Sequence, residues 1–244
     1  MSILPATHRH SASSGNCFRE SPDTFIWKYA LGNKGPTNSK MASGSAVEKA
    51  LAAVLVSGFD AEAAAAMTVE FYDMEMAGVI EPERADLPDM LKQALEALAP
   101  LGKPLTHQMP VDLQAGVHYG LRYPIIGYTD FGYPDFTLDL KCTWKLPSAP
   151  SFGHMLQMAV YWRLQDGKPQ KLAYVTPKKQ KVYDLAEEDL EHGWRVMLSN
   201  WRAIEALDRR CSSAADAIAL IPINPDSFRW RGADMATVLN TWGV

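Results

Sequence analysis

The sequence predicts a mixed α+β fold, because helical patterns stand on both sides of a stretch with strand character. Between residues 46 and 98, apolar side chains recur at helical spacing. Between 106 and 144, β-branched and aromatic residues are interrupted by Gly and Pro, which is typical of short strands and turns. A further helix and strand follow after residue 152, and no internal repeat is present. This order indicates one α+β domain rather than a repeat protein.

The composition is that of an ordinary globular protein that stays in water. The 244 residues are 47% hydrophobic and 21% charged, and no apolar run approaches the roughly 18 residues that cross a bilayer. The first fifteen residues lack the apolar core of a signal peptide, and three widely spaced cysteines form no disulfide framework. We therefore expect no membrane contact and a cytoplasmic location. The net charge of -4 means that any contact with nucleic acid must come from a local basic patch.

The expected elements follow from local pattern. Residues 32–45 are rich in Gly, Ser, Asn and Lys and are predicted to form a loop. Helices are then expected over 46–55, 61–77, 86–98, 152–164 and 187–209. Strands are expected over 107–115, 118–130, 136–144, 171–176 and 181–185, with the turn 131–135 closing a hairpin.

Several common catalytic motifs are absent. The sequence has no GxxxxGK[ST] phosphate loop, no GxGxxG turn, no HExxH helix and no GxSxG elbow. P-loop nucleotide hydrolysis, dinucleotide redox chemistry, zincin proteolysis and α/β-hydrolase chemistry therefore lose their main support. The six histidines show no zinc-ligand spacing.

The hairpin at 125–143 carries an acidic pattern that suits a hard divalent cation. Asp139 and Lys141 are two residues apart on a predicted strand, so their side chains project from the same face, and Leu140 projects from the other. Asp130 lies on the adjoining strand and can approach Asp139. Two neighbouring carboxylates repel unless a cation lies between them, and oxygen ligands suit Mg²⁺ or Mn²⁺. The ammonium of Lys141 could orient an attacking water or offset charge on a phosphate.

The tripeptide alone also has a plainer interpretation. Asp-x-Lys occurs a second time as Asp166-Gly167-Lys168, which is expected to be a solvated turn. By itself, the pair Asp139 and Lys141 is better explained as an exposed strand face with a cross-strand salt bridge. Asp135 belongs to the turn and lies too far along the strand from Asp139 to share one ion.

Flanking motifs in a fixed order favour the metal site over the exposed strand face. Gly127-Tyr128-Thr129-Asp130 precedes Asp139-Leu140-Lys141, and Gly44-Ser45-Ala46-Val47-Glu48 begins an upstream helix. Downstream, His154, Gln157 and Tyr161 share one face of a helix. The N-terminal segment adds a further match, with Ser11–Ser14, Pro22, Phe25 and Tyr29. Together these motifs resemble the PD-(D/E)XK nuclease superfamily, on its RecB-like and phage-exonuclease-like branch, over residues 11–185.

The resemblance implies a fold and a domain organisation. It implies a restriction-endonuclease-like core, made of a helix, a three-stranded meander, a helix and a strand, with extra N- and C-terminal helices. The whole chain 1–244 would then be a single nuclease domain, with its core at about 11–185 and a helical extension over 186–244.

The resemblance also implies a metal site. Glu48, Asp130, Asp139 and the backbone carbonyl of Leu140 would hold Mg²⁺, for which Mn²⁺ can substitute. Lys141 would align or deprotonate the attacking water, and Gln157 and Tyr161 would position the lysine, the water or the phosphate. For Glu48, the alternative is a simple charge in the first turn of its helix. No iron–sulfur cluster is expected, because Ser21 stands where cluster-binding relatives have a cysteine and three cysteines cannot supply four ligands.

The function implied is a metal-dependent deoxyribonuclease, most of all a double-stranded DNA exonuclease of the phage recombination type that leaves 5′-phosphates. Its partners would be double-stranded DNA ends, with a second copy of the chain or a single-strand annealing protein as further partners, in a bacterial or phage-infected cell. The alternatives are a non-catalytic nucleic-acid-binding or assembly protein on a nuclease scaffold, and a site-specific endonuclease. Expected contacts to nucleic acid are Ser13, Arg19, Lys178, Lys179 and Lys181, for each of which an ordinary solvated surface is the alternative.

Overall fold

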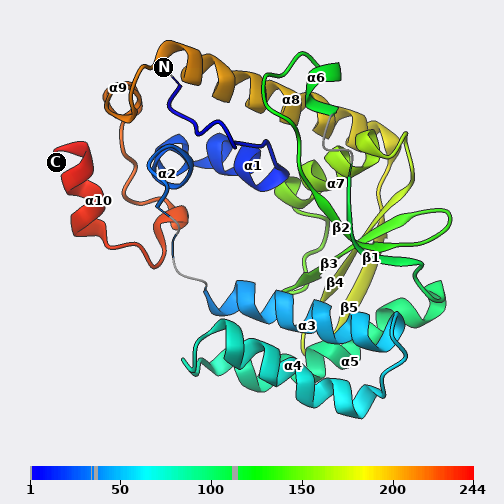
Figure 1. The fold of residues 1–244 in the computed structure, drawn as a ribbon. Coiled ribbons are helices and arrows are strands. Elements are labelled where there is room, and N and C mark those ends of the chain that lie inside the picture. The colour runs from blue at the N-terminus through cyan, green and yellow to red at the C-terminus, as the bar shows by residue number, and fades with distance from the viewer. Residues whose placement is uncertain (1, 34, 36–37, 112–114) are drawn as a thin grey trace. The chain divides into compact units, whose positions relative to one another are not determined.

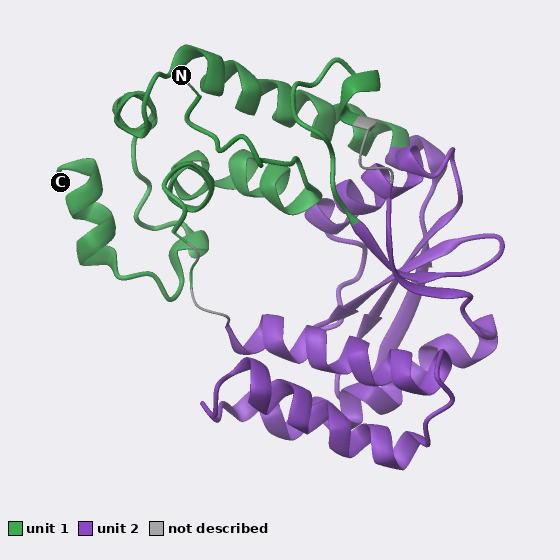
Figure 2. Cartoon of the chain, in the orientation of Figure 1, with its two compact units in different colours: residues 1–36, 112–127, 191–244 green, residues 37–111, 128–190 purple. Residues whose placement is uncertain are grey.

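A five-stranded mixed sheet organises the part of the chain that carries the predicted hairpin (Figure 1). The computed structural model describes residues 2–33, 35, 38–111 and 115–244. They divide into two compact units (Figure 2). The sheet unit comprises residues 37–111 and 128–190, and the helical unit comprises residues 1–36, 112–127 and 191–244. The α+β class predicted from the sequence is confirmed.

The strands of the sheet follow one another in chain order. They are β1 (Thr106–Pro110), β2 (Tyr128–Gly132), β3 (Thr137–Cys142), β4 (Gln170–Val175) and β5 (Gln180–Asp184). All neighbouring pairs are antiparallel except β3 and β4, which are parallel. Parallel strands need a crossover, and α7 (Phe152–Leu164) provides it. The sheet therefore consists of an antiparallel meander joined through a helix to a parallel strand.

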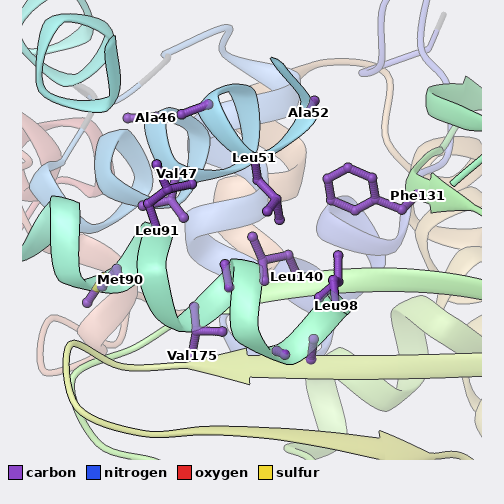
Figure 3. Packing of buried hydrophobic residues seen from close by; sticks show 14 of the residues in the cluster. Ala46, Val47, Leu51, Ala52, Met90, Leu91, Leu98, Phe131, Leu140 and Val175 are labelled. Atoms are coloured by element: carbon purple, nitrogen blue, oxygen red, sulfur yellow. The ribbon is translucent and has the colours of Figure 1, made fainter. Parts of the chain in front are cut away.

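The helices α3 (Ser39–Leu55) and α5 (Leu87–Leu98) pack against one face of this sheet, and α4 (Ala61–Glu75) packs against both of these helices. The 3₁₀ turns η2 (Pro82–Asp86) and η3 (Ala99–Leu101) flank α5. Leu51 and Leu91 from the helices pack with Phe131 and Leu140 from the strands in one hydrophobic core (Figure 3). Because side chains alternate along a strand, the burial of Leu140 against these helices directs Asp139 and Lys141 to the opposite face. The core thus determines the face on which the polar residues of β3 lie.

Side-chain caps explain where two of these helices begin. The Asn38 side chain accepts a hydrogen bond from the backbone N–H of Met41 at the start of α3. The Asp60 carboxylate accepts from the N–H groups of Glu62 and Ala63 at the start of α4. Such caps satisfy the donors that the first helical turn leaves unpaired.

The helical unit is held together by buried polar contacts. Its elements are α1 (Ala12–Glu20), α2 (Pro22–Phe25), the π-helix η1 (Ile26–Ala30), α6 (Ala115–His118), most of α8 (Glu187–Arg210), α9 (Ala214–Leu220), η4 (Phe228–Trp230) and α10 (Met235–Trp242). On α8, the Asp208 carboxylate accepts from the backbone N–H groups of Ile3 and Leu4. Glu205, one turn earlier, contacts the ring of His10 at 3.0 Å and accepts from the N–H of Tyr123.

Most predicted elements are confirmed within a few residues, and the strand over 118–130 is wrong. Only Tyr128 and the residues after it enter the sheet. Leu121, Tyr123 and Ile125 are buried alternately, which produced the strand pattern, but they pack inside the helical unit without a ladder partner beyond the isolated bridge between Ile125 and His10.

Two boundaries also differ from the prediction. The loop expected over 32–45 ends earlier, because the Asn38 cap starts α3 at Ser39. The strand expected over 107–115 is β1, which ends at Pro110, and residues 112–114 lie outside the described part of the chain. None of the described helices is both long and apolar enough to cross a bilayer. One nuclease domain with an extension over 186–244 stays a prediction.

Replacing Leu51 by alanine tests the core. Leu51 is fully buried, so the Leu51→Ala variant should lose about 2–5 kcal/mol of unfolding free energy through lost burial and a cavity. Urea denaturation measures this. Leu105, which is 67% exposed, provides the control, and Leu105→Ala should change stability by less than about 0.5 kcal/mol. Equal effects of the two substitutions would contradict this packing.

Candidate active site

The candidate site lies where β2 and β3 separate. Only two pairs join these strands, Phe131 with Leu138 and Gly132 with Thr137. Continuing this register would place Asp130 opposite Asp139 on one face of the sheet. Instead, Asp130 Oδ2 accepts a hydrogen bond of 2.8 Å from the backbone N–H of Leu140. A carboxylate thus takes the place of a ladder partner at the point where the sheet opens.

The same opening leaves the carbonyl of Leu140 directed toward β2. In a strand, the N–H and C=O of one residue point to the same edge. Since the N–H of Leu140 meets Asp130, its carbonyl points to the same side, beyond the last paired residues of β2 and β3. The resemblance implies this carbonyl as a backbone ligand, and that role stays a prediction.

Asp139 and Lys141 form a buried ion pair on the next part of β3. Lys141 Nζ lies 2.5 Å from Asp139 Oδ2, and Asp139 has no exposed surface. From α7, Gln157 joins the pair: its amide Nε2 donates to Asp139 Oδ1 at 3.0 Å, and its Oε1 accepts from Lys141 at 2.9 Å. Gln157 Nε2 also contacts the hydroxyl of Tyr161 at 2.8 Å. The structure therefore brings together Asp139, Lys141, Gln157 and Tyr161 as predicted, and excludes the exposed strand face.

Burial and neighbouring charges shift the pKa values of the ionisable groups in this site. Burial, followed by the charges of Asp139 and Glu48, raises the pKa of Asp130 well above its ordinary value. Burial also raises the pKa of Asp139, although Lys141 opposes that shift. For Lys141, burial alone would lower the pKa, but Asp139 and Asp130 outweigh it and the pKa is raised. Burial is therefore the largest cause of both carboxyl shifts, and the neighbouring carboxylates add to it.

Glu48 approaches this site from α3 and is held by two residues that sequence reasoning missed. His107 Nε2 lies 2.9 Å from Glu48 Oε1, and Gln108 Nε2 donates to the same oxygen at 2.5 Å. Gln108 Nε2 also reaches Asp130 Oδ1 at 3.5 Å. One amide nitrogen thus bridges Glu48 and Asp130, so their oxygens are no farther apart than these two contacts allow.

Gln108 has an unusual backbone that fits this bridging role. Its φ is 52°, in the left-handed region that non-glycine residues rarely adopt. In the register of β1 with β2, Gln108 stands opposite Asp130, between the pairs of His107 with Phe131 and Met109 with Thr129. Strained backbone of this kind clusters at functional sites. Only the hydrogen-bond geometry identifies Gln108, because a Gln inside a strand carries no signal in the sequence.

Two neighbours of the site are uncharged at neutral pH. His154 Nδ1 lies 2.7 Å from the hydroxyl of Tyr174, and burial, with the charge of Lys141, lowers the pKa of His154 to about 4. Cys142 packs against the hydrophobic core, and burial raises the pKa of its thiol to about 12. His154 is therefore neutral and Cys142 a protonated thiol at neutral pH.

The oxygen donors of the site suit a hard divalent cation, although the candidate ligands are engaged with other partners. Among the described residues, no three Asp, Glu, His or Cys side chains are already grouped as a metal site. Glu48 is bound to His107 and Gln108, and Asp139 to Lys141 and Gln157. Mg²⁺ needs only one or two carboxylates, since it keeps several waters. Asp130, Asp139 and the carbonyl of Leu140 fit that requirement, and all of these ligands, like Glu48, stay predictions.

The residues expected to contact nucleic acid fall in both units. Lys178, Lys179 and Lys181 lie in the sheet unit, at the connection from β4 to β5 and in β5, and all three are exposed. Ser13 and Arg19 lie on α1 in the helical unit; Ser13 is exposed, and Arg19 pairs with Glu20 at 2.5 Å. Their roles stay predictions.

Comparison with known proteins leaves the family open. No protein-family model and no curated protein matches the chain. A solved structure titled "Crystal structure of SSO0001" aligns with 73% of this chain and 82% of that one, at 15% identity and a TM-score of 0.31. A similarity this low supports no argument about fold or function.

Replacing Asp130 by asparagine should stabilise the metal-free protein. A carboxyl whose pKa is raised by folding contributes stability below its ordinary pKa, and that contribution is lost as the pH rises through the raised value. Asparagine keeps an acceptor for the N–H of Leu140 and removes the charge. With a chelator present, the Tm of Asp130→Asn should exceed that of the wild type at pH 7.5, and the difference should shrink as the pH falls toward 4.

The exposed turn residue Asp135 provides a matched control for this experiment. Asp135→Asn should leave the Tm within about 1–2 °C of the wild type, because exposed substitutions change stability little. A Tm of Asp130→Asn below that of the wild type at pH 7.5 would show that Asp130 stabilises the folded state as an ion.

Proposed function

We propose that this protein is a metal-dependent deoxyribonuclease of the PD-(D/E)XK type, on the RecB-like and phage-exonuclease branch. One observation carries the proposal. Asp130 and Asp139 are buried carboxylates on the neighbouring strands β2 and β3, at the point where the ladder between these strands ends. Lys141 lies two residues after Asp139, on the same face of β3, and pairs with it. The order of an antiparallel meander, the helix α7 and the parallel strand β4 supports the restriction-endonuclease-like core that the resemblance implies.

The proposed cofactor is Mg²⁺, with Mn²⁺ as a substitute, held by Asp130, Asp139 and the carbonyl of Leu140. When bound, such an ion lowers the pKa of a water and stabilises negative charge on the phosphate in the transition state. The protein supplies the oxygen ligands in a buried setting, where burial, followed by the charges of Asp139 and Glu48, raises the pKa of Asp130, so that its ionised form adds to an excess of negative charge. A divalent cation would remove this imbalance.

Lys141 would act as a donor in the reaction. Its raised pKa keeps the amine protonated, so the ammonium can hydrogen-bond the attacking water or a phosphate oxygen rather than accept a proton. Gln157 orients the ammonium through Oε1 and is itself oriented by Asp139 and Tyr161. In-line attack on the phosphorus would break the P–O3′ bond and leave a 5′-phosphate. Double-stranded DNA ends are the proposed substrate, and a second copy or a single-strand annealing protein is a proposed partner.

A degradation assay tests this function. With Mg²⁺ or Mn²⁺, the wild type should digest linear double-stranded DNA from its ends, and a chelator should stop it. Lys141→Ala should lower the rate by about 10²–10⁴-fold, the range expected for a positioned catalytic group. Asp139→Asn should be at least as severe, because it also removes a proposed metal ligand.

The exposed residue Lys103 provides the control for Lys141, and Lys103→Ala should retain the wild-type rate. Cleavage of covalently closed circular DNA would show that the protein is an endonuclease rather than an exonuclease. DNA binding without any metal-dependent hydrolysis by the wild type would instead favour the non-catalytic alternative.

A further inference from the structure

A second candidate site lies in the sheet unit, just beyond the ends of the two parallel strands. It is a pocket of about 480 Å³. Trp144 and Lys145 line it from the segment after β3, and Lys178 and Lys179 from the connection between β4 and β5. Asp86, at the end of η2, completes this side of the pocket. The carboxyl ends of parallel strands are a common place for ligands in sheets covered by helices.

Local hydrogen bonds hold the walls of this pocket. Thr176 Oγ1 accepts from the N–H groups of Lys178 and Lys179, at 3.2 and 2.9 Å, and donates to the carbonyl of Lys179. Across the pocket, Trp144 Nε1 donates to Asp86 Oδ2 at 2.6 Å, which orients the indole ring. Trp144 also packs against the hydrophobic core. The pocket is therefore built from a fixed turn and a fixed aromatic ring.

The charge of the pocket is strongly positive for a protein of net charge -4. Lys145, Lys178 and Lys179 are exposed, and within the described part of the chain no carboxylate pairs with any of them. The one carboxylate of the lining, Asp86, is bound to Trp144. Three ammonium groups around one engaged carboxylate attract an anion.

The remaining features select the kind of anion. A pocket of this volume takes a small organic ligand rather than a single inorganic ion. An indole ring beside ammonium groups matches a ligand with a flat base and a phosphate, since bases stack on aromatic side chains and lysines bind phosphates. Lys145 is only four residues beyond Lys141, at most about 14 Å of extended chain. A DNA strand bound at Lys141 can therefore reach this pocket within a few nucleotides.

We propose that this pocket binds one nucleotide, with its phosphate on Lys145, Lys178 and Lys179 and its base against Trp144. The nucleotide belongs to the DNA strand that enters the candidate active site, and in that form the inference rests on the proposed nuclease function. Free nucleoside monophosphate offers the same chemistry, and the experiment separates the two sources.

The test measures binding of a fluorescent single-stranded dT₁₂ and of dTMP to the full chain, in a chelator and at several salt concentrations. Lys178→Gln/Lys179→Gln should weaken dT₁₂ binding at least tenfold at low salt. For this double variant, the slope of log K against log salt should also be shallower, by about 0.7, because the proposal places one phosphate of the single strand on these lysines. The exposed pair Lys92→Gln/Lys103→Gln should bind as the wild type does.

A separate readout tests stacking. Bound dT₁₂ should quench tryptophan emission in the wild type, and Trp144→Phe should lose most of that quenching. Competition by dTMP at comparable concentration would identify a free nucleotide as the source, whereas binding of dT₁₂ alone would identify the strand. Superimposable dT₁₂ binding curves for the two lysine double variants, or unchanged quenching in Trp144→Phe, would contradict nucleotide binding in this pocket.

Because no hydrolysis occurs in the chelator, these results do not depend on catalysis. A wild-type protein that binds dT₁₂ through this pocket but never hydrolyses DNA would retain the pocket and refute the nuclease. A wild-type protein that hydrolyses DNA but shows no effect of the pocket variants would retain the nuclease and refute the pocket.

Discussion

The arrangement of the candidate site depends on one interaction, the hydrogen bond from the backbone N–H of Leu140 to the carboxylate of Asp130. It occupies the place where the β2–β3 ladder would otherwise continue. By ending the ladder there, it buries one carboxylate beside another and leaves a backbone carbonyl facing the same opening. Burying two neighbouring carboxylates costs free energy, and such an arrangement is typical of functional sites rather than of stable cores.

The surrounding structure serves to hold these charges in place. The hydrophobic side of β3, with Leu138 and Leu140, packs under α3 and α5, which leaves Asp139 and Lys141 on the face of α7. Gln157 then links the carboxylate to the ammonium through both ends of its amide. On the other side, Gln108 links Glu48 to Asp130. Two amide side chains therefore keep mutually repelling or strongly attracting groups at fixed positions without adding charge.

Much of this could be predicted from the sequence, and the exceptions have physical reasons. The amphipathic helices α5 and α8 were predictable because their periodicity reports burial directly. The prediction of a strand over 118–130 was wrong, because alternate burial also arises in an extended segment that packs against helices. At the site, Asp130, Asp139, Lys141, Gln157 and Tyr161 could be proposed from the order of motifs that carries the resemblance, because spacing alone favoured an exposed strand face. His107 and Gln108 could not, since their role depends on a β1 register and a left-handed backbone that no motif encodes.

The central claim is that the buried carboxylates form a site for a hard divalent cation. Titration calorimetry with Mn²⁺, in two buffers of different ionisation enthalpy, tests it most directly. The account predicts saturable binding that releases protons, because carboxyl groups with raised pKa values must lose them to become ligands. It also predicts that Asp139→Asn abolishes the binding. Absence of binding heat in the wild type, or binding that Asp139→Asn leaves intact, would contradict it.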